Sequence, residues 1–120
     1  MTRLKLNNNC LFCNIVQKEI PADILFQDEE LTVFKDINPQ APHHLLFVPN
    51  KHIDSLSDLT QDESALIGKL VLKINDIAKK NSWNEKGFRV VNNVGKLGGQ
   101  TVNHLHFHLL AGRAFEWPPG

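Results

Sequence analysis

Three of the six histidines in this 120-residue chain stand at alternate positions, in His104-Leu105-His106-Phe107-His108-Leu109-Leu110. Successive side chains of a β-strand point to opposite faces, so this spacing predicts a strand with the three imidazoles on one face. The residues between them are apolar, and we expect that face to join the hydrophobic core. The histidine face is expected to border a cleft, because imidazole acts near neutral pH as a nucleophile, a proton carrier or a metal ligand.

The rest of the chain combines short strand patterns with one strong helical pattern. Thr60 and Glu63 form a capping-box pattern before an amphipathic stretch, which predicts a helix over residues 60–81. Apolar spacing predicts a shorter helix over residues 11–17. Strands are expected at residues 24–26, 31–34, 44–48, 88–92 and 101–111, with the first two forming a hairpin. One long helix and a hairpin favour an α+β domain with an antiparallel sheet over a parallel βαβ sheet.

Length and charge limit the class of protein. The chain is long enough for one domain with one core, and its 13 basic and 13 acidic residues cancel. Such a balance provides no broad positive field to hold a nucleic-acid backbone. No stretch has the length and apolar character of a membrane span or a signal peptide. We therefore expect a cytoplasmic protein without a nucleic-acid or membrane partner, consisting of a flexible N-terminus (residues 1–9) and a single domain (residues 10–120).

The histidine spacing alone leaves several interpretations open. The rings could be merely hydrogen-bonded within a partly buried strand, although burying three titratable groups is costly. They could hold an open zinc site, with one position left for water. One imidazole could also attack an electrophile while its neighbours orient and protonate. The preceding Gly98-Gly99-Gln100-Thr101 favours this last interpretation, because its backbone N–H groups, amide and hydroxyl suit phosphate oxygens.

Taken together, these motifs resemble the histidine triad family, whose signature is His-x-His-x-His-x-x, and within it the Hint branch of purine nucleoside phosphoramidases. The resemblance covers the chain from Cys10 onward and includes Lys18-Glu19-Ile20-Pro21-Ala22, Asp36-Ile37-Asn38-Pro39-Gln40-Ala41-Pro42, Pro49-Asn50-Lys51-His52-Ile53, Gly98-Gly99-Gln100 and Trp117-Pro118-Pro119-Gly120. It implies a five-stranded antiparallel sheet with one long and one short helix. It also implies a homodimer whose sheets join into ten strands, with the helix over residues 60–81 at the interface.

The resemblance further implies a hydrolase that cleaves the P–N bond of purine nucleoside 5′-phosphoramidates. His106 would attack the α-phosphorus and form a nucleotidyl-histidine that water then hydrolyses, with no cofactor in the chemistry. The main-chain carbonyl of His104 would hold the attacking ring, His108 would contact the phosphate and His44 would assist proton transfer. The other implied contacts are Asp36 with the ribose, Gln100 and Thr101 with phosphoryl oxygens, Asn93 and Gly99 with the nucleotide, and Phe12, Ile15, Ile20, Phe34 and Ile37 with the base. On sequence alone these apolar residues suit an ordinary core equally well.

Cys10 and Cys13 form a Cys-x-x-Cys pair, which in a reducing compartment binds metal or does redox work more often than it forms a structural disulfide. Histidine triad relatives that carry this pair complete a tetrahedral zinc site with two histidines. The resemblance therefore implies structural zinc held by Cys10, Cys13, His52 and His104. A metal-free thiol pair and a redox motif are the alternatives.

Three positions depart from the commonest pattern of the Hint branch. Thr101 stands where serine is frequent, Asn103 where an aromatic residue is common and Lys35 where histidine often stands. These departures leave the preferred leaving group and nucleobase open.

Three other functions also remain open: dinucleoside polyphosphate hydrolysis, a nucleotide-binding regulatory scaffold with incidental hydrolysis, and an open-zinc hydrolase that a chelator would inactivate.

Overall fold

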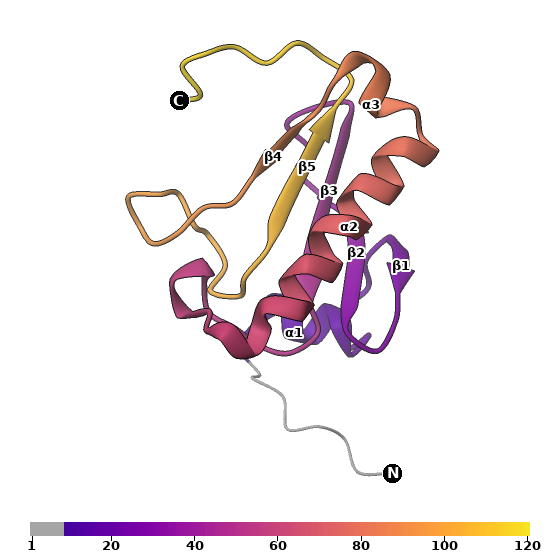
Figure 1. Ribbon diagram of the computed structural model, residues 1–120. Helices are drawn as coiled ribbons and strands as arrows, with labels where there is room; N and C mark the ends of the chain where they lie inside the picture. The colour runs from indigo at the N-terminus through magenta and orange to yellow at the C-terminus, as the bar shows by residue number, and fades with distance from the viewer. Residues whose placement is uncertain (1–8) are drawn as a thin grey trace.

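The computed structural model describes residues 9–120; the flexible N-terminus expected over residues 1–9 lies, apart from Asn9, outside the described residues. Within this part of the chain one five-stranded sheet has the order β1-β2-β3-β5-β4, with every neighbouring pair antiparallel (Figure 1). This confirms the α+β fold with an antiparallel sheet. The strands are β1 (Ile24–Gln27), β2 (Leu31–Lys35), β3 (His43–Pro49), β4 (Arg89–Val91) and β5 (Phe107–Ala111).

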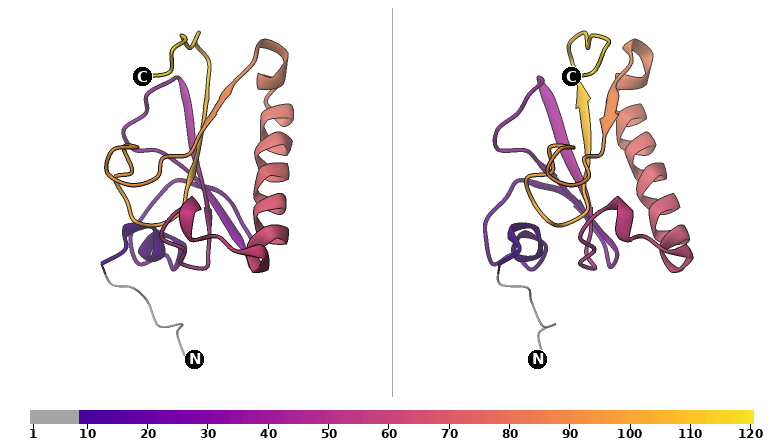
Figure 2. Two further views of the ribbon diagram at one scale, coloured as in Figure 1. Left: turned by 60° about the vertical axis from the view of Figure 1, so that its left-hand side comes forward. Right: turned by 90° about the vertical axis from the view of Figure 1, so that its left-hand side faces the viewer.

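Alternation along the central strand β3 assigns the two faces of the sheet to different helices. Leu45 and Phe47 pack in the core that α2 (Ser64–Lys80) covers. Leu46 and Val48 point to the opposite face and pack with α1 (Leu11–Val16). Figure 2 shows α2 along one side of the sheet and α1 on the other. Full burial of each of these side chains stabilises the fold by about 1.5–3 kcal/mol.

The histidine segment forms a shorter strand than the alternation predicts. Leu109 is in the core against α2 and Phe107 packs against it, as expected. The prediction of a strand over residues 101–111 was wrong in its first half, because β5 begins only at Phe107. The N–H of Leu105 donates to the carbonyl of Ile53 at 2.6 Å, in the segment after β3, instead of joining a strand ladder. His104 and His106 therefore precede the strand, and of the three only His108 belongs to it.

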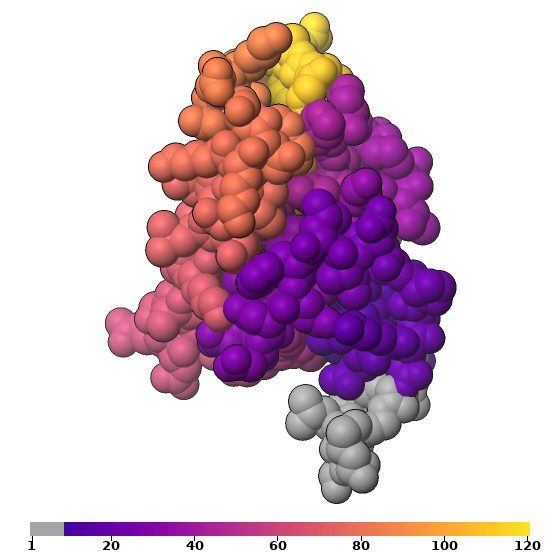
Figure 3. All heavy atoms as spheres, turned by 90° about the vertical axis from the view of Figure 1, so that its right-hand side faces the viewer, coloured from indigo at the N-terminus to yellow at the C-terminus, as the bar shows by residue number. Residues whose placement is uncertain are grey.

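The predicted capping box forms, but it opens a 3₁₀ turn, and the α-helix itself begins at Ser64 instead of Thr60. The N–H of Thr60 donates to the Glu63 carboxylate at 2.8 Å, and the Thr60 hydroxyl accepts from the N–H of Asp62 at 3.2 Å. A 3₁₀ turn over Gln61–Glu63 leads into α2, which lies along the surface of the molecule (Figure 3). Two short elements were not predicted, a 3₁₀ turn at Leu56–Asp58 and α3 (Trp83–Lys86). None of the helices in the described chain has the length and apolar character needed to cross a bilayer.

Candidate active site and metal centre

His106 lies just before β5, and its ring is fixed by its own main chain. Its Nδ1 lies 2.7 Å from the carbonyl oxygen of His104, so Nδ1 carries the proton and donates it. Only 4% of the residue is exposed, and the ring of Phe12 packs edge-on at a centroid distance of 4.9 Å. A neutral imidazole has one N–H, so this bond leaves a free lone pair on Nε2. This is the form of histidine that can act as a nucleophile.

The environment keeps this ring neutral. Burial lowers the pKa of His106, and the hydrogen bond to the His104 carbonyl opposes this effect without reversing it. Burial, reinforced by the neighbouring His106 and His44, lowers the pKa of His108 to about 4. Both rings are therefore uncharged at neutral pH, and the lone pair of His106 is available.

His44 and His108 form a hydrogen-bonded pair of rings next to His106. The backbone N–H of Gln40 donates to Nδ1 of His44 at 3.0 Å, so in the neutral ring the proton sits on Nε2. That Nε2 lies 2.9 Å from Nδ1 of His108 and 3.5 Å from a carboxylate oxygen of Asp36. Burial lowers the pKa of His44, and the charge of Asp36 opposes this. The His44 N–H therefore donates to His108, which carries its own proton on Nε2.

An apolar cavity of about 190 Å³ lies between α1 and the end of β2. Asp36 is on its wall, with one carboxylate oxygen accepting the N–H of Asn38 at 2.8 Å. Ile37 is on the rim and is 94% exposed. The structure thus brings together the whole set expected around a base and a ribose, namely Phe12, Ile15, Ile20, Phe34, Asp36 and Ile37.

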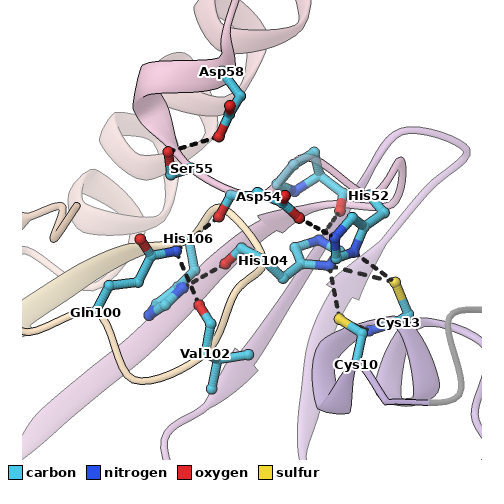
Figure 4. Close-up of polar contacts among 11 residues, drawn as sticks. Cys10, Cys13, His52, Asp54, Ser55, Asp58, Gln100, Val102, His104 and His106 are labelled. Carbon is cyan, nitrogen blue, oxygen red and sulfur yellow. Dashed lines mark hydrogen bonds and ion pairs between the residues drawn. The ribbon is translucent and has the colours of Figure 1, made fainter. Parts of the chain in front are cut away.

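The glycine-rich loop is held by the side chain of Gln100. Its amide nitrogen donates to the carbonyls of Asp54 at 2.7 Å and Val102 at 3.0 Å (Figure 4). Its amide oxygen accepts the N–H of Gly95 at 3.0 Å. Both ends of the amide are therefore engaged within the protein. Thr101 lines a separate surface hollow beside Cys10 and His52. Gly99 is exposed and Asn93 half-buried, and in the described chain neither makes a hydrogen bond to a triad ring.

Asn92 contacts the site, whereas the resemblance implied its neighbour Asn93. Its side-chain nitrogen donates to the carbonyl of His106 at 2.9 Å and so fixes the peptide that follows His106. Its Oδ1 is buried and has no hydrogen-bond partner among the described residues. Its place at the end of a predicted strand, one residue past the end of β4, could have drawn attention to it.

Lys35 is among the residues that wall the apolar cavity, but its side chain lies on the opposite face of the sheet. It pairs with Leu45 in the ladder between β2 and β3, and Leu45 belongs to the core on the α2 face. Directly paired residues share a face of the sheet. The Lys35 ammonium instead lies 3.4 Å from Asp23 at the surface.

Two cysteines and two histidines, one of them His104, gather where the ring of His104 points. Cys10 is the N-cap of α1, and its sulfur accepts the N–H of Cys13 at 3.3 Å. Nδ1 of His104 lies 3.3 Å from the Cys10 sulfur and 3.5 Å from the Cys13 sulfur, and Nδ1 of His52 lies 3.2 Å from the Cys13 sulfur (Figure 4). All four ligand atoms lie within 4.8 Å of one another. The residues implied by the resemblance therefore do meet at one point.

The hydrogen bonds of the two rings suit them to metal binding. Nε2 of His104 donates to the carbonyl of Pro49 at 2.8 Å, and Nε2 of His52 donates to the Asp54 carboxylate at 2.6 Å. Each ring then turns a bare Nδ1 toward the sulfurs, the arrangement typical of zinc-binding histidines. Burial lowers the pKa of His104 to about 4, which keeps its Nδ1 unprotonated. The donor set fits a closed, tetrahedral Cys₂His₂ site.

A second group of possible ligands, made of Asp36, His44 and His108, suits a metal less well. The Gln40 N–H places the His44 proton on Nε2, the atom that would have to be a ligand. The open zinc site of His104, His106 and His108 is also disfavoured. His104 faces the cysteines, the Nδ1 of His106 is bonded to a carbonyl and His108 faces His44, so the three rings serve separate partners.

Comparisons with known proteins agree with this geometry. A family model described as "Scavenger mRNA decapping enzyme C-term binding" matches residues 9–115. An uncharacterized HIT-like protein of Synechococcus elongatus is 44% identical over 115 residues, covering 96% of this chain and 100% of that protein. Protein HitA of Neisseria gonorrhoeae is 48% identical over 103 residues, covering 86% of this chain and 95% of that protein.

Solved structures show the same similarity. The crystal structure of a HIT family hydrolase from Legionella pneumophila matches with a TM-score of 0.91 at 47% identity, covering 93% of this chain and 100% of that one. A histidine triad protein from Clostridium difficile matches with a TM-score of 0.87 at 43% identity, covering 97% of each chain. Sheet order and histidine group thus define an α+β histidine triad domain. The chain belongs to the histidine triad (HIT) family.

Proposed function

We propose that this protein hydrolyses the P–N bond of purine nucleoside 5′-phosphoramidates through a nucleotidyl intermediate on His106. The observation that carries the proposal is the locked ring of His106, whose Nδ1–H is bonded to the His104 carbonyl at 2.7 Å and whose Nε2 lone pair is free. The similar Legionella protein, a HIT family hydrolase, supports hydrolysis as the class of reaction.

Substrate binding would divide between the apolar cavity and the histidine rings. The purine would enter the cavity walled by Phe12 and Phe34, and the ribose hydroxyls would donate to Asp36, whose carboxylate can only accept. Phe12 touches both this cavity and the ring of His106, so a nucleotide bound there would bring its α-phosphate toward Nε2. Such positioning supplies a large part of the rate enhancement in phosphoryl transfer.

In the first step the Nε2–P bond forms and the P–N bond to the amine breaks. The ring of His108 lies beside that of His106, with the two centroids 5.0 Å apart. We assign to its Nε2–H a hydrogen bond to a phosphoryl oxygen and then transfer of the proton to the departing nitrogen, which leaves as a neutral amine. His106 becomes positively charged as it is nucleotidylated, which strengthens its Nδ1–H bond to the His104 carbonyl. In the second step water attacks phosphorus, the P–Nε2 bond breaks and leaves His106 neutral, and the proton that water loses returns to Nε2 of His108, whose Nδ1 accepts the N–H of His44.

Phosphoryl oxygens would receive further hydrogen bonds from the loop over residues 95–102. Because the Gln100 amide already holds this loop, its backbone N–H groups and the Thr101 hydroxyl are the better candidates. Gly99 and Asn93 remain proposed nucleotide contacts. Asn92, with its buried unpartnered Oδ1, is a further candidate at the same edge.

We propose zinc as the metal of the Cys10, Cys13, His52 and His104 group. When bound, a four-ligand zinc acts as a structural cross-link. The residues that hold it join α1, the segment after β3 and the segment before β5. His104 belongs both to this group and to the hydrogen bond that orients His106.

We also propose a homodimer in which two sheets join into ten strands. β4 is an edge strand with Val90 43% exposed. On the outer side of α2, Val71 and Leu72 are 50% and 68% exposed. Apolar side chains on an edge strand and its neighbouring helix favour association through this side.

Substrate turnover tests the proposed function. Wild-type protein and His106→Asn are incubated with an adenosine phosphoramidate, a guanosine phosphoramidate and a diadenosine polyphosphate, and released mononucleotide is measured. We expect phosphoramidate cleavage by the wild type and a loss on the order of 10⁶-fold in His106→Asn, as when other covalent nucleophiles are removed. His43→Asn, a change in an exposed histidine beside the site, serves as the matched control and should retain activity.

Other results would point elsewhere. Faster cleavage of the diadenosine compound would favour a polyphosphate hydrolase, and tight nucleotide binding without turnover would favour a regulatory scaffold. Equal turnover by wild type and His106→Asn would contradict the covalent mechanism.

A further inference from the structure

We propose that Arg113, outside the histidine group, is a positioning residue. Through the main chain of Gln40 it fixes which nitrogen of His44 carries the proton, and thereby which hydrogen-bonding group His108 presents to the substrate. The kinetic consequence rests on the proposed function, whereas the hydrogen-bonded relay can be measured independently of any activity.

Gln40 connects the two ends of this relay. Nε of Arg113 donates to the carbonyl of Gln40 at 3.0 Å, and the N–H of Gln40 donates to Nδ1 of His44 at 3.0 Å. Gln40 is thus held through both of its peptide groups. Its side chain turns elsewhere, to the carbonyl of Asn38 at 3.1 Å, so the relay uses only its main chain.

The tautomer of His44 determines that of His108. With Nδ1 of His44 accepting from Gln40, its Nε2 donates to Nδ1 of His108, and His108 keeps its proton on Nε2. If His44 carried its proton on Nδ1, its bare Nε2 would require a donor from His108. His108 would then place its proton on Nδ1 and turn a bare Nε2 outward, where the proposed mechanism needs a donor. The Gln40 peptide, together with the Asp36 carboxylate 3.5 Å from Nε2 of His44, therefore favours the form of His108 that can serve a phosphoryl oxygen or a departing amine.

The chain around Arg113 packs closely on this loop. Gly112 has φ of 100°, and a Cβ added there would lie 2.8 Å from Cβ of Pro42 and 3.2 Å from Cδ2 of His43. Only glycine adopts this conformation readily and allows so close an approach. In Figure 3 the C-terminal atoms, in yellow, lie against the atoms coloured for the region near residue 40. The Arg113 guanidinium is also held over the ring of Phe115 at 4.2 Å.

Arg89 offers a matched control on the same C-terminal segment. Its guanidinium donates to the carbonyl of Glu116 at 2.8 Å and lies 5.3 Å from the ring of Phe115. Within residues 9–120 it makes no hydrogen bond to the loop over residues 36–42. Removing Arg89 should therefore disturb the C-terminal segment without releasing Gln40.

The test combines kinetics with ¹⁵N NMR of the histidine rings, on the wild type, Arg113→Ala, Arg113→Lys and Arg89→Ala. We expect wild-type His44 and His108 to be protonated at Nε2. Arg113→Ala should show a mixture of tautomers and a kcat for phosphoramidate cleavage about 5- to 10-fold lower, with KM nearly unchanged, the size of one lost hydrogen bond. Arg113→Lys should recover part of the loss, and Arg89→Ala should match the wild type.

Two results would overturn the proposal: wild-type His44 protonated at Nδ1, or the same tautomers and kcat in Arg113→Ala as in the wild type. An equal loss in Arg89→Ala would also overturn it, since the effect would then come from the C-terminal segment as a whole. A wild type that cleaves no phosphoramidate would contradict the proposed function, while its NMR spectra would still decide the relay.

A second pair of variants tests the Gln40 peptide directly. Gln40→Pro deletes the N–H that donates to His44, whereas Gln40→Ala removes only the side chain. We expect the tautomer mixture in Gln40→Pro and wild-type spectra in Gln40→Ala. Thermal unfolding shows whether Gln40→Pro is folded, and if it is not, the Arg113 variants decide the proposal.

Discussion

Nδ1 of His106 lies 2.7 Å from the main-chain oxygen of His104, while the ring of the same His104 faces the sulfurs of the cysteine pair. One residue therefore links the proposed nucleophile to the proposed metal centre. His104 is fully buried among closely packed atoms, so a shift of its ring should also move its main-chain carbonyl.

Loss of a metal ligand should therefore also disturb the orientation of the proposed nucleophile, His106. We expect Cys13→Ser purified without chelators to contain little zinc, to unfold at a lower temperature and to have a lower kcat than the wild type. Metal analysis, thermal unfolding and kinetics measure the three effects. A wild type without zinc above background would contradict the proposed metal centre.

A milder change in the same centre is Asp54→Asn, which weakens the acceptor of the His52 N–H. Changes of this kind in the partners of metal ligands typically cost about 10–100-fold in metal affinity. We expect a loss of this size in competition titrations with a zinc chelator. Asp62→Asn, an exposed carboxylate in the turn before α2, is the control and should bind zinc as the wild type does.

The pKa of His108, lowered to about 4, bears on how kcat/KM changes as the pH falls below 7. Its neutral form persists well below its ordinary value of 6.5, and protonation would require His108 to stop accepting from His44. The pKa values of His106 and His44 are also lowered, so we expect kcat/KM to stay nearly constant from pH 7 to pH 6.5 and to fall only at lower pH. A decline centred near pH 6.5 would show that the ring titrates as if it were solvated.

Asp28 makes a separate contribution to stability. Burial raises its pKa, but hydrogen bonds from Lys69 and from the N–H groups of Glu30 and Leu31 outweigh this and lower it to about 2. A carboxyl group with a lowered pKa in the folded state stabilises the protein above its unfolded value of 3.8, and this stabilisation is lost as pH falls toward 2. The free energy of unfolding, measured by chemical denaturation between pH 5 and pH 2, should therefore fall more steeply for the wild type than for Asp28→Asn. Parallel curves would exclude this role.

The proposed dimer predicts that a charge on the outer side of α2 separates the subunits. Leu72→Lys places an ammonium where a partner would bury an apolar side chain worth about 1.5–3 kcal/mol. Light scattering after size exclusion should give a dimer for the wild type and a monomer for Leu72→Lys. Leu97→Lys, a change in a fully exposed residue of the glycine-rich loop, should remain dimeric. A monomeric wild type would refute the dimer.

Local patterns were sufficient to predict most of the fold. The amphipathic stretch after Thr60 predicted α2 closely, because this helix buries one face with the period of a helix. The continuous apolar run before Pro49 predicted β3, because this strand is buried on both faces. The strand over residues 101–106 was wrong because alternation does not reveal that Leu105 bonds to Ile53 and that His104 turns to the cysteines. For these residues long-range contacts determine the backbone.

The site was predictable where side-chain identity carries the chemistry. The Cys-x-x-Cys motif indicated a metal, whereas the full set of four ligands and the cavity wall were implied by the family resemblance; the structure brings each set together. The resemblance also implied the His104 carbonyl, which lies 2.7 Å from Nδ1 of His106. The Gln40 N–H was not predicted, since every residue except proline has this group and sequence alone cannot place it. The side chain of Gln100 suggested a phosphate contact, yet its amide is used to hold the loop.

The most direct test of the central claim is the covalent intermediate itself. Wild-type protein is mixed briefly with an adenosine phosphoramidate, quenched in alkaline urea and measured by intact and peptide mass spectrometry. We predict a mass increase of one adenylyl group, located on His106, in the wild type and in His43→Asn, and no increase in His106→Asn. An adduct on another residue, or rapid turnover that leaves no adduct at any quench time, would contradict nucleophilic attack by His106.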